Sequence, residues 1–112
     1  MFNFPPKSER SVNISTDGND ELLCPDCGSN YLHQTSLRVM ARTKGEDGPG
    51  TITSVAGDGA ATIRSAASSE LPGRRDSVEI LFWCEQCGED APEKVLQLLQ
   101  HKGNTITTWI SP

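Results

Sequence analysis

The four cysteines constrain this chain more than any other feature, because they form two C-x-x-C pairs that are each followed by glycine. The first pair reads C24-P-D-C-G28 and the second reads C84-E-Q-C-G88. Two residues between the cysteines let a tight turn aim both sulfurs at one point, and glycine tolerates the positive φ needed to leave such a turn. Each pair supplies two of the four ligands of a tetrahedral metal site. We therefore predict one metal site with Cys24, Cys27, Cys84 and Cys87 as its ligands.

The surroundings of the cysteines favour zinc over disulfides. The N-terminus, M1-F-N-F-P-P-K-S-E-R10, lacks the apolar core of a secretory signal, and no apolar run approaches the roughly 20 residues needed to span a membrane. We therefore expect a cytoplasmic protein, in which paired cysteines are metal ligands rather than disulfides. Neither pair opens a helix within a βαβ unit, which disfavours two redox motifs. Zinc is the default occupant of a four-thiolate site, so we expect one structural zinc ion.

Composition and charge limit the core and the partners. Only 35% of the 112 residues are hydrophobic and 5% are aromatic, so the core is thin and a metal staple is expected. The formal net charge is −5. An acidic chain lacks the excess of Lys and Arg that non-specific nucleic-acid binding requires.

The chain divides into an arm, a domain and an insertion. Residues 1–20 show no periodicity and are predicted to form a flexible N-terminal arm, and residues 21–112 form a single domain. Alternating polarity predicts half-buried strands at 36–42 and 77–83. The stretch 43–73 is rich in Gly, Ser, Thr, Ala and Pro, and we interpret it as a mobile insertion. Within it, segments 51–55 and 61–65 flank G57-D58-G59, which predicts a weak hairpin.

The tail allows two interpretations. D90-A-P-E93 has the spacing of a capping box, and the leucines that follow fit a short helix over 91–102 after the second pair. Alternatively, 96–101 is a strand, 102–104 is a turn, and the β-branched segment 105–110 is the return strand. We favour the two strands, because a four-cysteine site of this kind sits beside strands.

The two knuckles, 24–28 and 84–88, each beside a predicted strand, resemble those of a zinc ribbon. Y31-L-H33, R74-R-D76 and Q100-H-K-G-N-T105 are similar to segments of small uncharacterised zinc-ribbon proteins of bacteria and their phages. This likeness covers about residues 22–110, although the 56 residues between the pairs exceed the spacing in most compact ribbons. It implies a small, β-rich, mainly antiparallel zinc ribbon with a hairpin-bearing insertion. By analogy, it also implies a role near transcription, translation or nucleic-acid machinery. Rubredoxins have similar knuckles and bind iron, but this chain departs from them in spacing and in its few aromatic residues.

The sequence offers no catalytic site. A metal held by four thiolates has no open position for water, so we expect no hydrolysis there. His33 and His101 stand alone, and neither a phosphate-binding glycine loop nor a G-x-S-x-G elbow is present. His33 is expected at the surface or beside the site rather than as a ligand. We therefore predict no enzyme, no catalytic residue and no small-molecule substrate.

Function must then depend on surfaces, and two hypotheses remain. We favour a non-enzymatic adaptor or regulator that binds a protein, because the chain is acidic. The alternative is a ribbon that binds nucleic acid through a basic strand face, with Trp83 or Trp109 stacking on bases if they do not fill the core. Electron transfer through iron is a third, less favoured class. The candidate contacts for either partner are Arg38, Arg42, Arg74, Arg75, His101 and Lys102.

Overall fold

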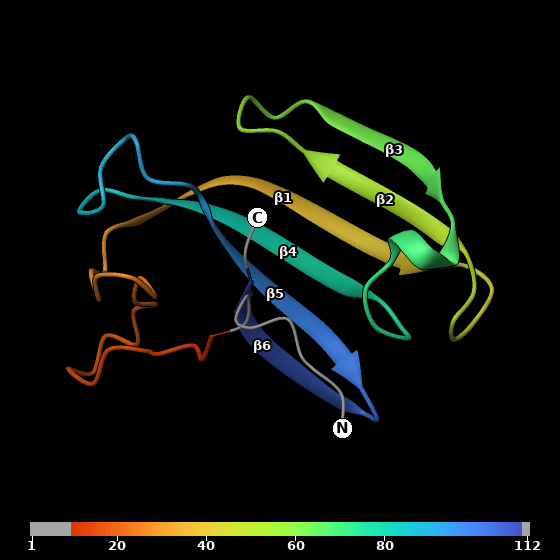
Figure 1. Cartoon of the computed structure of the whole chain (residues 1–112), viewed down its shortest axis with the longest axis horizontal. Coiled ribbons are helices and arrows are strands. Elements are labelled where there is room, and N and C mark those ends of the chain that lie inside the picture. Colours follow the sequence, from red (N-terminus) through yellow and green to blue (C-terminus); the bar gives the residue numbers. More distant parts are fainter. Residues whose placement is uncertain (1–9, 111–112) are drawn as a thin grey trace, which may run out of the picture.

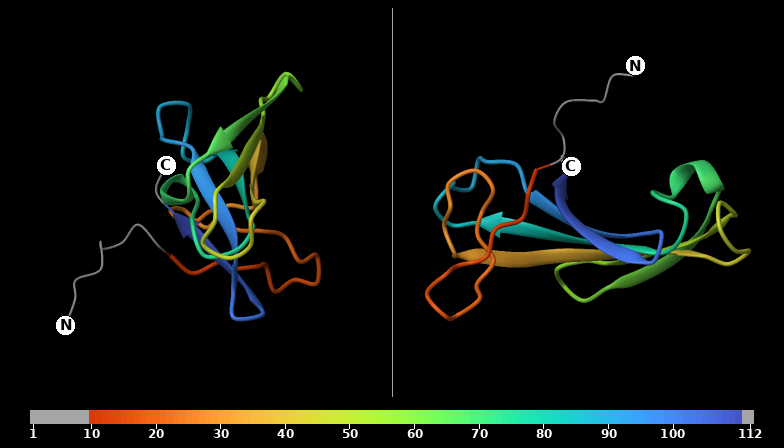
Figure 2. Two further views of the ribbon diagram at one scale, coloured as in Figure 1. Left: turned by 90° about the vertical axis from the view of Figure 1, so that its right-hand side faces the viewer. Right: turned by 90° about the horizontal axis from the view of Figure 1, so that it is seen from below.

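In the computed structural model, which describes residues 10–110, six strands form one open antiparallel sheet (Figure 1). The order across the sheet is β3-β2-β1-β4-β5-β6. The mainly antiparallel, β-rich fold predicted from the sequence is therefore confirmed. Views from the sides show that the sheet is a single twisted layer (Figure 2). The strands are β1 (Leu32–Arg42), β2 (Gly50–Val55), β3 (Ala61–Ala66), β4 (Ser77–Cys84), β5 (Lys94–His101) and β6 (Asn104–Ile110).

The two central strands carry the alternating sequences that predicted them. β1 pairs with β4 from Leu32↔Cys84 to Met40↔Ser77, and a β-bulge between Gln34 and Ser36 shifts the register by one residue. Because β4 ends at Cys84, the second knuckle starts where the sheet ends. The loops containing the two knuckles lie at the same end of the sheet, and the short 3-10 helix η1 (Ser68–Glu70) lies at the other (Figure 1).

The predicted hairpin in the insertion is present as β2 and β3. The two strands pair from Gly50↔Ala66 to Val55↔Ala61, around the expected turn at residues 57–59. β2 also pairs with β1 over six residues, from Leu37↔Val55 to Arg42↔Gly50. The insertion thus extends the main sheet by two strands.

In the tail, the two-strand interpretation is correct and the helix over 91–102 is wrong. Residues 94–101 form β5, which pairs with β4 on one side and with β6 on the other. The acidic residue of the apparent capping box, Glu93, accepts a hydrogen bond from the Thr35 hydroxyl at the bulge of β1. Pairing on both edges therefore outweighs the local helix signals.

The turn between β5 and β6 yields a stability prediction. His101 pairs with Asn104, so Lys102 and Gly103 form a two-residue loop with φ values of +50° and +83°. This is the backbone of a type I′ turn, whose first position prefers asparagine, and lysine adopts positive φ at a cost. We expect Lys102→Asn to stabilise the protein by about 0.5–1 kcal/mol, measured by urea unfolding. Lys102→Ala removes the same charge without favouring positive φ. An equal gain in both variants would contradict the prediction.

Buried side chains form two clusters on opposite faces of the sheet. Met40, Ile52 and Ala66 project from one face, the Met40 face, where Leu71 after η1 covers them. On the opposite face, the Phe82 face, Phe82 and Trp109 meet edge to face with ring centroids 5.7 Å apart, and Leu96 packs with them. This second cluster occupies the half of the sheet nearer the knuckles.

The arm predicted at 1–20 is partly described. Residues 1–9 lie outside the described residues. Arg10 exchanges two backbone hydrogen bonds with Trp109 on β6, and Ile14 forms an isolated bridge with Leu22. Val12 and Leu22 pack against the cluster around Phe82. Val12 and Leu22 therefore cover part of the Phe82 face over β4, β5 and β6.

No helix in the described part of the chain is long and apolar enough to cross a membrane.

Candidate metal centre

The sulfurs of all four cysteines lie within 4.8 Å of one another. Cys24 and Cys84 are buried, Cys87 is half-buried and Cys27 is exposed. Two sulfur pairs each join one knuckle to the other: Cys24 to Cys87 at 3.8 Å and Cys27 to Cys84 at 3.6 Å. Cysteines 24–27 and 84–87 therefore form one cluster.

These distances fit a metal ion bound by four thiolates. With metal–sulfur bonds of about 2.3 Å, the sulfurs of a regular zinc tetrahedron lie about 3.8 Å apart. A disulfide needs its sulfurs about 2.05 Å apart, well short of either measured distance. The donor set is thus compatible with a structural metal site, and four cysteines could hold the ion without help from any other residue.

The two knuckles repeat the same turn. The backbone N–H of Gly28 donates to the carbonyl of Cys24 at 3.0 Å, and that of Gly88 donates to the carbonyl of Cys84 at 3.3 Å. Both glycines have positive φ, +80° and +91°. A Cβ at either position would meet no atom within 4 Å, so it is the backbone angle, and not space, that requires glycine. This agrees with the turn chemistry expected from the sequence.

Strand pairing sets the distance between the knuckles. Cys84 is the last residue of β4 and pairs with Leu32, the first residue of β1. One residue further on, the N–H of Glu85 donates to the carbonyl of Tyr31 at 3.1 Å. Within the first knuckle, the N–H of Cys24 donates to the carbonyl of Ser29 at 2.8 Å. The sheet thus brings together cysteines that lie far apart in sequence.

The thiols resist losing all of their protons together. Burial, together with the neighbouring thiols of Cys27, Cys84 and Cys24, raises the pKa of Cys87 to about 12. For Cys84, burial works in the same direction, but the N–H of Cys87 and the adjacent thiols outweigh it and lower its pKa to about 7. Some sulfurs ionise readily, whereas a full set of four needs a cation to offset the repulsion.

A buried lysine lies beside the cysteines, and sequence reasoning missed it. The Lys94 side chain is 4% exposed, and its Nζ lies 3.0 Å from Oδ2 of Asp26, which is inside the first knuckle. Arg10 also donates to Asp26. Burial opposes the charge of Lys94, but Asp26 and the sulfurs of Cys87 and Cys24 raise its pKa. No linear pattern pairs residue 94 with residue 26, because the contact arises only when β5 reaches the knuckle.

This contact predicts that mutation of Asp26 costs more stability when Lys94 is present than when it is absent. Asp26→Asn removes the carboxylate charge and leaves Lys94 buried without its partner, so we expect a loss of about 2 kcal/mol in the free energy of unfolding. The figure lies below that of a fully buried pair because Asp26 is 42% exposed. Urea unfolding of the metal-loaded protein measures it. In a Lys94→Met background the same change should cost much less; an equal cost would show that the ion pair is not responsible.

The arginines predicted as partner contacts are engaged with neighbouring residues of the chain. Arg38 pairs with Glu79 across β1 and β4 at 2.7 Å. Arg74 and Arg75 face the loop between β1 and β2, where Arg75 Nε lies 3.2 Å from Glu46. Arg42 donates to the carbonyls of Leu71 and Gly73 and to the Ser68 hydroxyl. Arg38, Arg74 and Arg75 thus each face a carboxylate of the chain, and Arg42 is bound to backbone carbonyls and a hydroxyl.

The remaining candidate residues are dispersed. His101 and Lys102 are exposed at the turn between β5 and β6, at the end of the sheet away from the knuckles. Trp109 is 1% exposed and belongs to the core, which removes it as a base-stacking residue. Trp83 is half-buried and packs against His33, with ring centroids 5.1 Å apart. His33 itself is exposed beside the second knuckle, 2.9 Å from Glu85.

Comparison with known proteins gave no match: no protein-family model, no curated protein and no solved structure matches the chain.

Proposed function

We propose that the chain is a non-enzymatic adaptor or regulator of the zinc-ribbon type, in which one zinc ion on Cys24, Cys27, Cys84 and Cys87 holds the fold. The observation that supports this is the closed set of four sulfurs within 4.8 Å, whose spacing matches a four-thiolate zinc tetrahedron. Such a site leaves no ligand position for water or substrate, so the metal's role is structural and not catalytic.

The role of an adaptor follows from charge and from the surfaces. The net charge is −5, and Arg38, Arg74 and Arg75 each face a carboxylate, which favours a protein partner over nucleic acid. The likeness of segments 31–33, 74–76 and 100–105 to small zinc-ribbon proteins of bacteria and their phages suggests a bacterial or phage origin and a partner in the host machinery. A nucleic-acid-binding ribbon is the weaker candidate, because Trp109 is buried.

Elemental analysis of the purified protein tests the metal. We expect one zinc per chain and a colourless preparation. A red preparation that contains iron would replace the proposal with electron transfer, and clearly less than one metal per chain would overturn the site.

A binding comparison tests the function. Gel shifts in a series of increasing salt should show no complex with DNA or RNA even at low salt; binding that falls steeply with salt would support the nucleic-acid alternative. Affinity purification from the source organism, followed by reconstitution of each complex from purified components, should give one stable protein complex. Failure of every captured protein to bind the isolated, metal-loaded chain would contradict the adaptor role.

A further inference from the structure

The Phe82 face is covered over only one of its halves. Val12 and Leu22 pack on the half formed by β4, β5 and β6, around Phe82 and Trp109. Over β3, β2 and β1 the same face is exposed or half-buried in the described part of the chain. Ile63 on β3 is 71% exposed there, and Val39 on β1 is 37% exposed.

Two cross-strand rows run on this face from β3 across β2 and β1 to β4, and we call them the uncharged patch; its Ile80 also packs against the cluster around Phe82. Strand pairing aligns Ile63, Thr53, Val39 and Val78 in the first row. The second row consists of Ala61, Val55, Leu37 and Ile80. None of these eight residues carries a charge.

The opposite face differs sharply. On the Met40 face, the same strands carry Arg38, Arg64 and Glu79. A sheet that is apolar on one face must bury that face against another layer. Since 22% of the chain is charged, an uncharged patch across four strands is a surface suited to an apolar partner.

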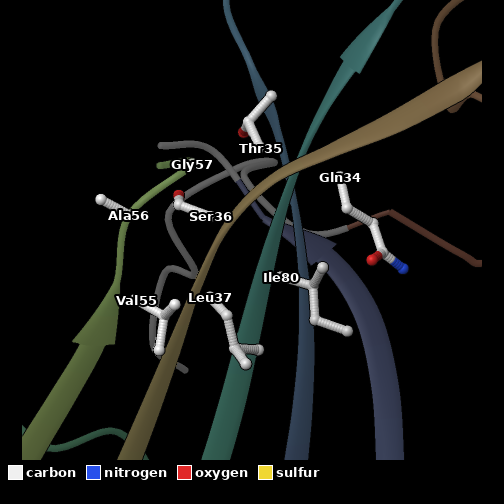
Figure 3. Close-up of a pocket in the computed structure, with 8 residues that line it drawn as sticks. All are labelled: Gln34, Thr35, Ser36, Leu37, Val55, Ala56, Gly57 and Ile80. Carbon is white, nitrogen blue, oxygen red and sulfur yellow. The ribbon is translucent and has the colours of Figure 1, made fainter. Parts of the chain in front are cut away.

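The patch contains both a knob and a hollow. Ile63 is the most exposed large hydrophobic side chain in the described part of the chain. Next to it, a hollow of about 340 Å³ is lined by Leu37, Val55 and Ile80 together with the bulge of β1 and the turn after β2. Figure 3 shows these three side chains on neighbouring strands. In a twofold contact, a knob and a hollow on the same face of one copy meet the hollow and the knob of the other.

We propose that two copies of this chain pack face to face through the uncharged patch. A twofold axis lying in the interface, midway between Ile63 and the hollow, places Ile63 of each copy over the hollow of the other. The two sheets then form a sandwich, with the inner faces about 10 Å apart. No charge is buried in this contact, although the whole chain is acidic. The proposal is independent of the adaptor role.

The area of the uncharged patch indicates how tightly the two copies should bind. Four strands about 4.8 Å apart, and the roughly four residues per strand that the two rows span at about 3.4 Å each, give roughly 260 Å² of flat sheet per copy. Twice this area lies below the 1,200–2,000 Å² of a standard stable interface. We therefore expect a weak, reversible dimer that forms only at high protein concentration.

Sedimentation equilibrium of the full-length, metal-loaded chain from about 10 µM to 1 mM tests the dimer. The wild type should shift from monomer to dimer with concentration. Ile63→Asp should weaken the dimer at least tenfold, because it places a charge in the contact. The matched control is Ile106→Asp, which charges a 41% exposed isoleucine on the opposite face and should leave the dissociation constant unchanged.

A second variant separates face packing from pairing at the exposed edge of β3. Val39 lies on central strand β1, so Val39→Ser should weaken face-to-face packing several-fold without touching the edge. Circular dichroism and metal content confirm that each variant is folded. A wild type that stays monomeric at 1 mM would overturn the proposal. So would equal effects of Ile63→Asp and Ile106→Asp, or a dimer that Ile63→Asp disrupts and Val39→Ser does not.

Discussion

Removing the metal with a strong chelator is expected to unfold the chain. The four sulfurs hold the start of β1 against the end of β4, and the cluster around Phe82 next to them is small. Structural zinc contributes about 10–16 kcal/mol of apparent binding free energy in zinc-finger peptides, whereas whole domains are stable by only about 5–15 kcal/mol. Without the cation, nothing offsets the repulsion between the crowded thiolates, which must take up protons or separate. A thin core cannot compensate for losses of this size.

Two signals report this unfolding. Far-UV circular dichroism should lose its sheet signal, and tryptophan emission should move to the red as Trp109, 1% exposed in the fold, meets water. Both should recover when zinc is added back. Cys84→Ser should behave as the chelated protein even with zinc present, because it removes a buried ligand.

Gln86→Ser is the matched control. Gln86 is exposed and lies between Cys84 and Cys87 in the same knuckle, so the change should leave metal content and stability unaltered. If a chelator strips the metal while both optical signals stay unchanged, the cysteine cluster does not hold the fold.

The sequence predicts the metal centre better than its surroundings. The spacing and the glycines of the two knuckles are local signals, and they specify a turn that the structure contains twice. Alternation along β1 and β4 likewise predicts strands without reference to distant residues. In contrast, the contact of Lys94 with Asp26 depends on which strand reaches the first knuckle. Only the assembled sheet decides that.

The same limit explains the tail and the arginines. Residues 90–102 do have the local pattern of a helix. That pattern contains no information on the hydrogen bonds that β5 forms with β4 and β6. Arg74 and Arg75 look available in the sequence, yet the loop after β1 brings Glu46 and Asp47 to them. Whether a charge is paired is a property of tertiary structure.

Gly50→Ala is expected to destabilise the protein by about 3 kcal/mol, near the upper end for overpacking. Gly50 begins β2, and a Cβ built there would lie 1.8 Å from the carbonyl oxygen of Ala41 on β1. The obstacle is backbone, so no side-chain rotation relieves it. The chain must move β2 away from β1, which breaks the pairing of Gly50 with Arg42 and the bond from Thr43 N–H to the carbonyl of Pro49.

Gly59→Ala in the turn of the same hairpin is the control. Gly59 has φ of +89°, but a Cβ there would meet nothing within 4 Å, so the cost should be the backbone term alone, about 1 kcal/mol. Urea unfolding measures both variants, and hydrogen exchange locates the change. In Gly50→Ala the amides of β2 and β3 should exchange faster, while metal content stays at the wild-type level, because the cysteines lie at the other end of the sheet. Equal losses of unfolding free energy in the two variants would contradict this prediction. They would mean that β2 does not approach β1 closely at Ala41 and that the insertion is a loosely attached hairpin.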